Sequence, residues 1–310
     1  MGSRTHDLAG VPLVIKLDDD VQTLRVLGVG AGVVGRATGL ALRDLGHRVR
    51  FADIDDGVVE RLRADGLEAS HMANLDLSDV DLVLVSVQTP TFEDHADLRY
   101  LEAAIADVGE ALGRAATSEP HRYRVVVVRS TIPPGTTEDR LIPVLETRSG
   151  LRAGQDFGVS MTPEYLRHWN AQADAAAPRA VVIGELDERS GDLVERLVAP
   201  FGRPIHRMPI RAAEFHKYVH NLANAAKISF FNELREVATS IGVDADRVFG
   251  LVTETAEGFW NAAYGTLGLG SFEGCLSKDL RAFLTWASER GLELPVASGA
   301  EDTNRRSERG

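Results

Sequence analysis

The sequence predicts an α/β protein: a doubly wound parallel sheet followed by a smaller all-helical domain with one long central helix. Two observations support this prediction. Up to about residue 209, short β-branched runs alternate with single segments of helical spacing, and parallel strands require such crossovers. After that point, residues 210–241 contain neither proline nor glycine, which indicates one long helix.

The first part of the chain contains six runs that are typical of strands. They are residues 24–29, 48–53, 81–87, 123–128, 157–161 and 180–183. Between the first two runs, apolar side chains recur at helical spacing, namely Val33, Ala37, Leu40, Ala41 and Leu45. The predicted sheet therefore begins with a strand, a glycine turn and a helix.

The second part of the chain is predicted to be helical. Along residues 210–241, apolar side chains form one stripe, made of Phe215, Val219, Leu222, Ala226 and Phe230. Shorter helices are expected at about residues 244–257 and 278–290. These patterns divide the chain into an N-terminal extension at 1–23, a sheet domain at 24–209, a helical domain at 210–298 and a flexible tail at 299–310.

The composition excludes several classes of function. The chain is 44% hydrophobic and 26% charged, and no run approaches the roughly 18 apolar residues that cross a bilayer, so a soluble enzyme is expected. A formal charge of −12 disfavours nucleic-acid partners. One cysteine forms no intramolecular disulfide, which favours the reducing cytoplasm. The apolar run at 8–15 lacks a cleavage pattern and is assigned to the extension rather than to a signal peptide.

A glycine-rich turn follows the first predicted strand and opens the first helix. Gly30, Gly32 and Gly35 fit the dinucleotide-binding pattern G-x-G-x-x-G, with Val33 and Val34 in the variable positions. In this context the glycines allow a tight turn and a close approach of backbone to pyrophosphate. At the end of the second strand, Asp53 is placed to accept hydrogen bonds from a ribose diol, and its charge would repel a 2′-phosphate. The sequence therefore predicts a Rossmann-type domain that binds NAD rather than NADP.

Five further motifs occur in the order and at the spacing of one known family. They are Gln88-Thr-Pro-Thr91, Ser130-Thr-Ile-Pro-Pro-Gly-Thr-Thr137, Thr162-Pro-Glu-Tyr-Leu-Arg167, Glu214–Asn221 with Lys227–Glu233, and Cys275-Leu-Ser-Lys-Asp279. Through them the chain resembles the UDP-glucose and GDP-mannose dehydrogenases, the nucleotide-sugar 6-dehydrogenases, over about residues 24–300. Five motifs found together are far more specific than any one of them.

The resemblance implies the oxidation of a primary alcohol of a sugar nucleotide, or of a related sugar or nucleoside, to a carboxylate with two NAD. It implies that Cys275 captures the aldehyde as a thiohemiacetal and then carries a thioester. Lys217 and Asn221 lie four residues apart and share a helix face, which suits joint stabilisation of an oxyanion. The family's remaining catalytic positions fall on Asp279 as an acid and base, Glu164 as the carboxylate of thioester hydrolysis and Thr131 as a water-positioning hydroxyl.

Further binding residues follow from the same resemblance. Contacts with NAD are implied for Thr89, Pro90, Thr91, Thr131 and Lys278. Contacts with the substrate are implied for Glu164, Tyr165, Leu166, Arg167, Lys217, Asn221, Gly268, Gly270, Phe272 and Glu273. No metal is expected, because His216 and His220 have the spacing of half a zinc site but no third ligand follows them.

The surroundings of Cys275 give two opposing predictions for the reactivity of its thiol. Ser277 is a reasonable N-cap, so the positive end of the following helix should lower the pKa of the thiol. The neighbouring carboxylate of Glu273 should raise that pKa. A lone cysteine is also often only a small buried hydrophobe.

The chain departs from the family pattern in three places. Phe272 and Glu273 stand where the family has paired glycines, and Ser277 stands where it has proline. His168-Trp-Asn170 replaces the acidic and small residues that commonly follow the Leu-Arg pair. The chain also ends at Gly310, near the start of the connection to the family's second nucleotide-binding domain. We therefore expect either a piece of a longer chain or a short form with an altered substrate.

Two alternatives to a four-electron dehydrogenase stay open. A two-electron dehydrogenase of the β-hydroxyacid or alcohol-to-aldehyde type shares the Lys-Asn helix pair and needs no cysteine. A non-catalytic NAD-binding homologue that regulates a relative is the other. In either case the resemblance implies a homodimer formed through the helix at 210–241.

Overall fold

The structure is a computed structural model, and it describes most of the chain. The described residues are 23–118, 122–240, 242–255, 271–289, 291 and 294–307. The N-terminal extension up to residue 22 lies outside them, as do residues 308–310 of the expected tail. Two residues expected at the substrate, Gly268 and Gly270, also lie outside the described part of the chain.

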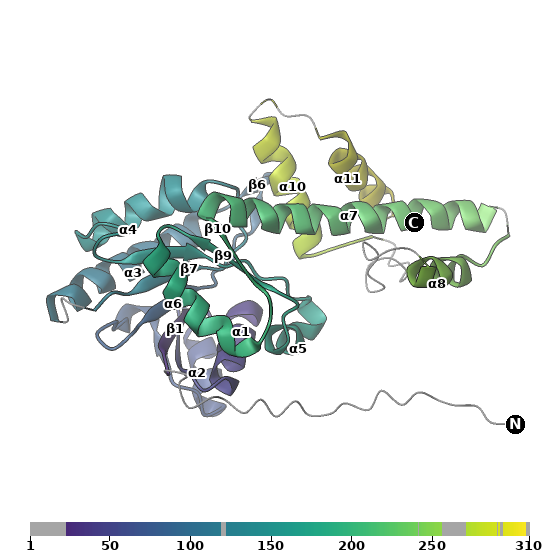
Figure 1. Ribbon diagram of the computed structural model, residues 1–310. Helices are drawn as coiled ribbons and strands as arrows, with labels where there is room; N and C mark the ends of the chain where they lie inside the picture. The colour runs from purple at the N-terminus through teal and green to yellow at the C-terminus, as the bar shows by residue number, and fades with distance from the viewer. Residues whose placement is uncertain are drawn as a thin grey trace, which may run out of the picture.

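An eight-stranded sheet forms the centre of the first domain (Figure 1). Its order is β3-β2-β1-β4-β7-β8-β9-β10, and all neighbours are parallel except β8 and β9. The strands are β1 Arg25–Val29, β2 Arg48–Asp53, β3 Ala69–His71, β4 Leu82–Val85, β7 Val125–Val128, β8 Gly158–Met161, β9 Val181–Glu185 and β10 Ile205–Pro209. The prediction of a doubly wound α/β sheet is confirmed.

Three features of the sheet differ from the simple prediction. β9 runs antiparallel to β8, because the connection between them carries only short helices rather than a full crossover helix. The edge strands β3 and β10 were not predicted, since β3 has three residues and β10 mixes charged with apolar side chains. A two-stranded hairpin, β5 Thr91–Phe92 and β6 His95–Ala96, projects from the loop that follows β4.

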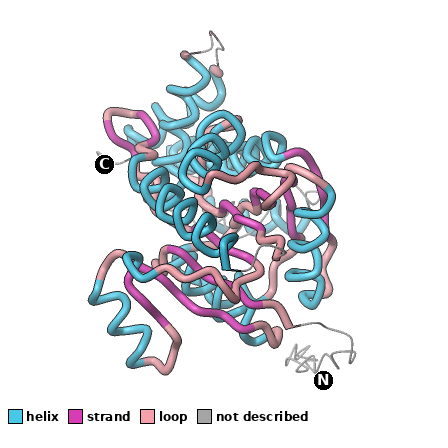
Figure 2. The backbone as a smooth tube through the Cα atoms, turned by 90° about the vertical axis from the view of Figure 1, so that its left-hand side faces the viewer, coloured by secondary structure: helices cyan, strands magenta, loops and turns pink. Residues whose placement is uncertain are grey.

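Helices cover both faces of the sheet (Figure 2). The described helices are α1 Val33–Asp44, α2 Asp56–Ala64, α3 Arg99–Ser118, α4 Ile142–Ser149, α5 Ala171–Ala176, α6 Glu188–Val198, α7 Ile210–Ser240, α8 Ala245–Thr255, α10 Cys275–Ser288 and α11 Pro295–Ser307. Short 3-10 turns lie at Met72–Asn74, His168–Asn170 and Ala199–Phe201, and a π-helical turn lies at Thr137–Leu141. None of the described helices is long and apolar enough to cross a membrane.

Alternation along the strands decides which helices pack on which face. In β4, Val83 and Val85 belong to the apolar cluster under α3, α4 and the start of α7. Leu82 and Leu84 of the same strand belong to the cluster under α1, α2 and α6. Both faces are buried because every second side chain of a strand points to the same face.

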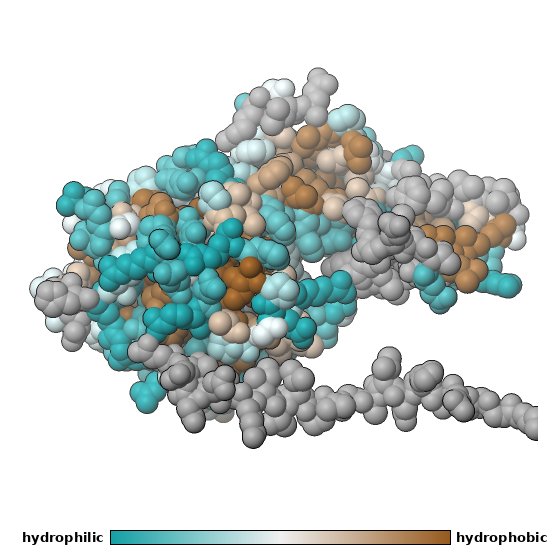
Figure 3. Space-filling view, in the orientation of Figure 1, coloured by the Kyte–Doolittle hydropathy of each residue, from teal (hydrophilic) through white to brown (hydrophobic). Residues whose placement is uncertain are grey.

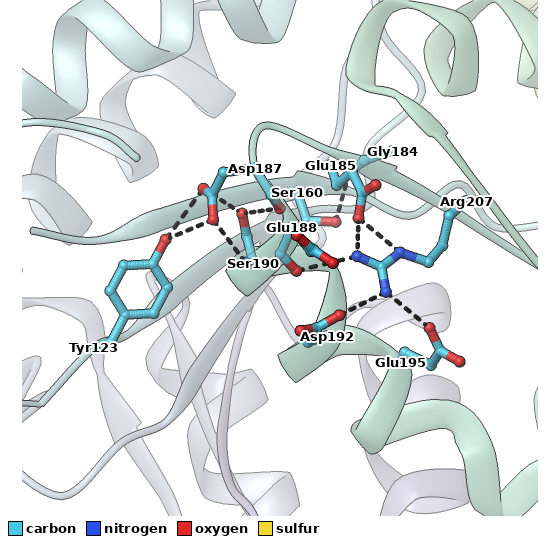
Figure 4. Close-up of polar contacts among 10 residues, drawn as sticks. All are labelled: Tyr123, Ser160, Gly184, Glu185, Asp187, Glu188, Ser190, Asp192, Glu195 and Arg207. Carbon is cyan, nitrogen blue, oxygen red and sulfur yellow. Dashed lines mark hydrogen bonds and ion pairs between the residues drawn. The ribbon is translucent and has the colours of Figure 1, made fainter. Parts of the chain in front are cut away.

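A polar network fastens α6 to the edge of the sheet (Figure 4). The guanidinium of Arg207, on β10, donates to Glu185 at 2.8 Å, to Asp192 at 2.6 Å and to Glu195 at 3.1 Å. Asp187 caps α6 by accepting from the backbone N–H of Ser190 at 2.9 Å. The network therefore ties together β9, α6 and β10, the part of the sheet that runs against the other strands.

The long helix α7 leaves the sheet and carries α8, α10 and α11 (Figure 1). Its predicted apolar stripe is wrong at the N-terminal end, because Phe215 and Val219 are each 48% exposed. The inward face instead carries Tyr218, with Lys217 and Asn221 beside it, all buried. The polar pair is therefore not on a solvent face, and the start of α7 turns it toward the sheet domain.

The C-terminal segment is not a flexible tail within the described residues. α11 extends to Ser307 and packs against α7 and α10. It buries Ala300, Glu301, Thr303 and Asn304. The prediction of a flexible tail from residue 299 is therefore wrong for 299–307, because this segment forms a helix with one face buried against α7 and α10.

Candidate active site

The glycine turn between β1 and α1 has the geometry of a dinucleotide site. Gly30 has φ +82°, a value that favours glycine, and an added Cβ would lie 2.7 Å from the carbonyl oxygen of Ser86. A Cβ on Gly35 would lie 1.9 Å from the carbonyl oxygen of Gly30. A Cβ on Gly32 would meet nothing within 4 Å, so open space lies beside that residue. Gly30 and Gly35 therefore allow the turn to close, and Gly32 leaves room for a ligand.

The N-terminus of α1 is free of a side-chain cap. Its N-cap is Gly32, no side chain caps it, and its first turn carries no acidic residue. Such an end presents unpaired N–H groups and a partial positive charge, which suit a phosphate group. Val33 is 47% exposed at this end, so the approach is open. These observations agree with the pyrophosphate of a dinucleotide.

Asp53 lies at the C-terminal end of β2, beside the turn. Its Oδ2 accepts from the N–H of Ala31 at 2.7 Å, and its Oδ1 accepts from the N–H of Asp55 at 3.0 Å. Each carboxylate oxygen keeps a further lone pair, so the group can still accept hydrogen bonds from two hydroxyls. The residues of this region therefore fit NAD.

The predicted NAD contacts on the loops after β4 and β7 are joined to α10. Lys278 Nζ donates to the carbonyl oxygen of Thr89 at 3.2 Å, and Thr91 Oγ1 donates to the carbonyl oxygen of Lys278 at 3.3 Å. Thr89 Oγ1 donates to the carbonyl oxygen of Thr131 at 2.8 Å. Pro90 lies between the two threonines of the first loop. The loops and α10 therefore form one connected wall, which places Lys278 between the two domains.

Lys217 and Glu164 form a buried ion pair. Lys217 Nζ donates to Glu164 Oε1 at 3.0 Å, and both side chains are at least nine-tenths buried. Glu164 Oε2 accepts from the N–H of Leu166 at 2.7 Å. Burial acts to raise the pKa of Glu164, but the Lys217 ammonium and the Leu166 N–H lower it overall. Glu164 is therefore a carboxylate at neutral pH.

Asn221 and Asp279 form the second half of the cluster. Asn221 Nδ2 donates to Asp279 Oδ2 at 2.5 Å, and Asp279 is 1% exposed. Its other oxygen lies 2.8 Å from Lys278 Nζ. The contacts with an amide and a cation fix the orientation of this buried carboxylate. Asp279, which lies on α10, is therefore held by Asn221 of α7 and by its neighbour Lys278.

Cys275 is the first residue of α10, one helical turn before Asp279. The thiol is exposed, yet partial burial of its side chain raises its pKa, and Asp279 and Glu164 raise it further. Lys278 and Lys217 act in the opposite direction. Charged residues of α7, α10 and the loop after β8 influence the same thiol because the fold brings these distant segments together.

The expected activation of the thiol by a Ser277 N-cap is wrong. The N-cap of α10 is Gly274, with φ +65°, and the helix starts three residues earlier than predicted. Ser277 lies within the first turn and its Oγ accepts from Arg281 at 2.8 Å. Glu273 is exposed and is not among the charges that act most on the thiol. The pKa of Cys275 is raised, not lowered, and burial with Asp279 is the cause.

A cavity with a volume of about 700 Å³ lies next to Glu164. The predicted substrate residues Glu164, Tyr165, Leu166 and Arg167 line it, but Cys275 and Lys217 do not. Its walls run under α1, α5 and α6 toward the sheet. Glu164 therefore lines this cavity, and its carboxylate also pairs with Lys217, which is not part of the lining.

Three side chains of the cavity were missed by sequence reasoning. Buried polar atoms without a hydrogen-bond partner line it, namely Thr38 Oγ1, Arg129 Nε and Thr162 Oγ1. Arg129 is deeply placed, and desolvation lowers its pKa despite the charge of Glu164. Such atoms favour a polar occupant of the cavity. Arg129 directly precedes the Ser130-Thr motif, and that adjacency is the signal that could have identified it.

The helix histidines pack on Tyr165. The hydroxyl of Tyr165 lies 2.7 Å from His216 Nδ1, and its ring lies edge-on to the ring of His220 with centroids 4.7 Å apart. Lys217 Nζ lies 5.4 Å from the centre of the same ring. The two histidines thus line the pocket, and Tyr165 contacts positions 216, 217 and 220 of α7.

Comparison with protein families gives two matches along the chain. Residues 56–202 match the NAD-binding domain of the UDP-glucose/GDP-mannose dehydrogenase family, and residues 211–306 match the central domain of the same family. The interval between the two matches, residues 203–210, contains β10 and ends at the first residue of α7.

Individual relatives agree with the family matches. The chain is 32% identical to GDP-mannose 6-dehydrogenase of Pseudomonas aeruginosa over 302 residues, which cover 91% of this chain and 68% of that one. It is 30% identical to a UDP-glucose 6-dehydrogenase of Haloferax volcanii, covering 89% and 68% of the two chains.

A solved structure shows the same fold. The UDP-glucose dehydrogenase of the archaeon Pyrobaculum islandicum superposes with a TM-score of 0.81 and 30% identity over 94% of this chain and 70% of that one. The glycine turn, the buried Lys-Glu pair and the two matches therefore lead to one conclusion. The chain belongs to the UDP-glucose/GDP-mannose dehydrogenase family and is an NAD-dependent dehydrogenase.

Proposed function

We propose that the protein oxidises a primary alcohol of the C6 hydroxymethyl type to a carboxylate, on a sugar nucleotide or a related sugar or nucleoside. The observation that carries this proposal is the buried cluster in which Lys217 pairs with Glu164 and Asn221 with Asp279, one helical turn along α10 from Cys275, the only cysteine of the chain. The names of its relatives, GDP-mannose 6-dehydrogenase and UDP-glucose 6-dehydrogenase, support a sugar nucleotide as substrate.

NAD supplies the hydride acceptor for each of the two oxidations. The residues that would hold it are Gly30, Gly32 and Gly35 with Val33 and Val34 at the pyrophosphate, Asp53 at the ribose, and the wall of Thr89, Pro90, Thr91, Thr131 and Lys278. This assignment rests on the open space beside Gly32 and on the uncapped end of α1.

Lys217 and Asn221 stabilise negative charge on the reacting oxygen. Lys217 gives one of its three N–H bonds to Glu164 and keeps two for a substrate oxygen. Asn221 gives one N–H to Asp279 and keeps the second. Both groups are buried, so their interaction with an alkoxide or oxyanion is stronger than it would be in water.

Cys275 acts on the aldehyde produced by the first oxidation. Its thiol proton passes to Asp279, the sulfur bonds to the carbonyl carbon, and the oxygen takes up a proton to give a thiohemiacetal. Release of a hydride from that carbon, for which bound NAD would be the acceptor, and of the hydroxyl proton to Asp279 would leave a thioester. Glu164, ionised beside Lys217, accepts a proton from water placed by Thr131, and hydroxide displaces the sulfur as thiol and leaves the carboxylate.

One observation favours a second candidate, a two-electron dehydrogenase that releases the aldehyde or a ketone. The pKa of Cys275 is raised, so little thiolate is present at neutral pH before substrate arrives. In that case Lys217 and Asn221 would still serve the alcohol oxidation, and Cys275 would not react.

Product stoichiometry separates the two candidates. The purified protein is incubated with NAD and a panel containing UDP-glucose, GDP-mannose and related nucleosides, and NADH is counted per product. We expect two NADH per carboxylate and a Cys275 adduct by mass spectrometry, and we expect Cys275→Ala to stop at the aldehyde. Unchanged carboxylate production by Cys275→Ala would overturn covalent catalysis. The absence of NADH with every substrate would instead support a non-catalytic NAD-binding protein.

We also propose a homodimer formed through α7 and its neighbours. Apolar side chains are exposed on these helices, including Phe215 and Val219 of α7 and Leu251 of α8. Figure 3 shows hydrophobic surface over α8, apart from the largely hydrophilic face of the sheet domain. Sedimentation velocity at micromolar concentration should give twice the chain mass, and a monomer would contradict this proposal.

A further inference from the structure

The side chain of Asn304 holds the backbone of Phe272, three residues before Cys275. Asn304 Oδ1 accepts from the N–H of Phe272 at 2.6 Å, and Asn304 Nδ2 donates to the carbonyl oxygen of the same residue at 3.0 Å. Asn304 lies on α11 and is 1% exposed. One amide therefore satisfies both polar groups of a single buried peptide position, as a neighbouring strand would.

Phe272 is fixed through its ring as well. The ring is 3% exposed and packs in an apolar cluster with residues of three helices, namely Ala225 and Ile228 of α7, Leu280 of α10 and Ala300 of α11. The family resemblance has glycine at this position, so the ring distinguishes this chain from that pattern, whereas the two bonds from Asn304 use only backbone groups. The loop therefore has one rigid point just before the nucleophile.

Little chain separates this rigid point from the sulfur. After Phe272 come the exposed Glu273 and then Gly274, whose φ of +65° turns the backbone into α10. Cys275 is the first helical residue. With so few free torsions between them, the position of the Cys275 backbone follows the position of Phe272.

We propose that Asn304 is a positioning residue, which sets the place of Cys275 relative to Lys217, Asn221 and Asp279. It acts through the Phe272 backbone and touches no reacting group. The inference rests on the proposed function. It gives a positioning role to α11, most of which lies within the segment that matches the family's central domain.

An amide is required at this position because the site needs one acceptor and one donor. In Asn304→Asp the carboxylate can still accept from the Phe272 N–H, but it has no N–H for the carbonyl oxygen. The side chain has nearly the same size, so the packing of α11 is preserved. The change therefore removes half of the anchor and places two oxygens in contact.

The test uses the chemistry of the single cysteine, so it does not depend on turnover. Iodoacetamide reacts with Cys275 alone among the thiols, and its rate is measured from pH 6 to 10 by mass spectrometry. For Asn304→Asp we expect a looser loop and a displaced Cys275, hence an alkylation rate at neutral pH that differs by about threefold or more from that of the unaltered protein. We expect kcat to fall about 10- to 100-fold, with KM for NAD unchanged.

Ser229→Ala is the matched control. Ser229 Oγ donates to the carbonyl oxygen of Ala300 at 3.2 Å, so it joins α7 to α11 without touching the cysteine loop. We expect a similar small loss of thermal stability, with alkylation and kcat within about twofold of the unaltered protein. If Asn304→Asp fails to fold, Asn304→Ser, which is too short to reach the loop, replaces it.

Two results would overturn the inference. One is an alkylation profile and kcat for Asn304→Asp that match the unaltered protein. The other is an equal change of both quantities in Ser229→Ala, which would mean that Asn304 acts only through the docking of α11. If no substrate is turned over, the alkylation profile still decides the positioning role, and the failure then belongs to the proposed function.

Discussion

The glycine turn at the NAD site differs from the buried cluster of Lys217, Glu164, Asn221 and Asp279 in the kind of group that forms it. The turn is one continuous segment, Gly30–Gly35, and it works through backbone groups and through space that side chains would fill. The cluster takes side chains from α7, α10 and the loop after β8, and it works through buried charges. A substitution in the turn should therefore act through volume, and one in the cluster through charge.

The largest difference is expected within the turn itself. In Gly35→Ala the new Cβ would lie 1.9 Å from the backbone oxygen of Gly30, so the turn must open. We expect a loss of at least about 2 kcal/mol in the free energy of unfolding, and NAD affinity too weak to measure. Denaturant unfolding and calorimetric titration with NAD check both.

Gly32→Ala is the matched change, since a Cβ there meets nothing within 4 Å. We expect stability within about 1 kcal/mol of the unaltered protein and a rise of about tenfold or more in the Kd for NAD. Equal stability losses in Gly32→Ala and Gly35→Ala would show that volume is not what the turn controls.

In the cluster, removal of one charge should lower the free energy of unfolding strongly, whereas removal of both charges should lower it little. Lys217→Met leaves Glu164 as an unpaired buried carboxylate, so we expect a loss of about 3–5 kcal/mol in the free energy of unfolding at pH 7. Lys217→Met/Glu164→Gln should regain most of this stability without regaining activity. A double variant as unstable as the single one would contradict the pairing.

The same pair gives a pH dependence with a defined sign. The folded-state pKa of Glu164 is lowered, so its stabilisation is present above the ordinary value of 4.5 and is lost as pH falls through the lowered pKa. In Lys217→Met the pKa of Glu164 should rise instead, so this variant should gain stability relative to the unaltered protein as pH falls from about 7 to 5. Thermal melts across that range measure the difference.

Asp53 is the charged side chain beside the glycine turn, and its substitution tests whether charge matters for NAD binding there. Asp53→Asn keeps an acceptor for the Ala31 N–H but removes the negative charge. We expect the KM for NAD to rise about tenfold and the preference over NADP to shrink by a similar factor. Asp55→Asn, at the N-cap of α2, is the control and should leave both KM values unchanged.

The smallest effects are expected at the thiol. Asp279 raises the pKa of Cys275 and Lys278 lowers it, so Asp279→Asn should speed alkylation at pH 7.5 several-fold and Lys278→Gln should slow it. The pH profile of iodoacetamide labelling measures both. Shifts in the same direction for the two variants would show that burial alone controls this thiol.

The fold was largely predictable from the sequence because its signals are local. Alternating β-branched runs gave the inner strands, and the glycine turn followed from backbone conformations that few other residues adopt. The edge strands β3 and β10 carry too few apolar residues to be recognised. The helix α11 was missed because its sequence is polar, and only its docking on α7 stabilises it.

The site was predictable only as a set of residues. Motif order identified Glu164, Lys217, Asn221, Cys275 and Asp279, but not which of them pair with each other. The ion pair between Lys217 and Glu164 and the bond between Asn221 and Asp279 require segments more than fifty residues apart to meet. Arg129 had only its adjacency to the Ser130-Thr motif as a signal, and Asn304 had none, because their contacts depend on how distant segments pack.

The sequence by itself determined the doubly wound sheet and the glycine turn, since each depends on neighbours within one element, and its motifs selected Glu164, Lys217, Asn221, Cys275 and Asp279 only through a family resemblance. Only the tertiary structure decided the state of those residues: a raised rather than lowered pKa at Cys275, a buried rather than solvated Lys217, and a cysteine loop held by α11. The physical reason is that burial and charge pairing depend on packing between distant segments, which no local pattern contains.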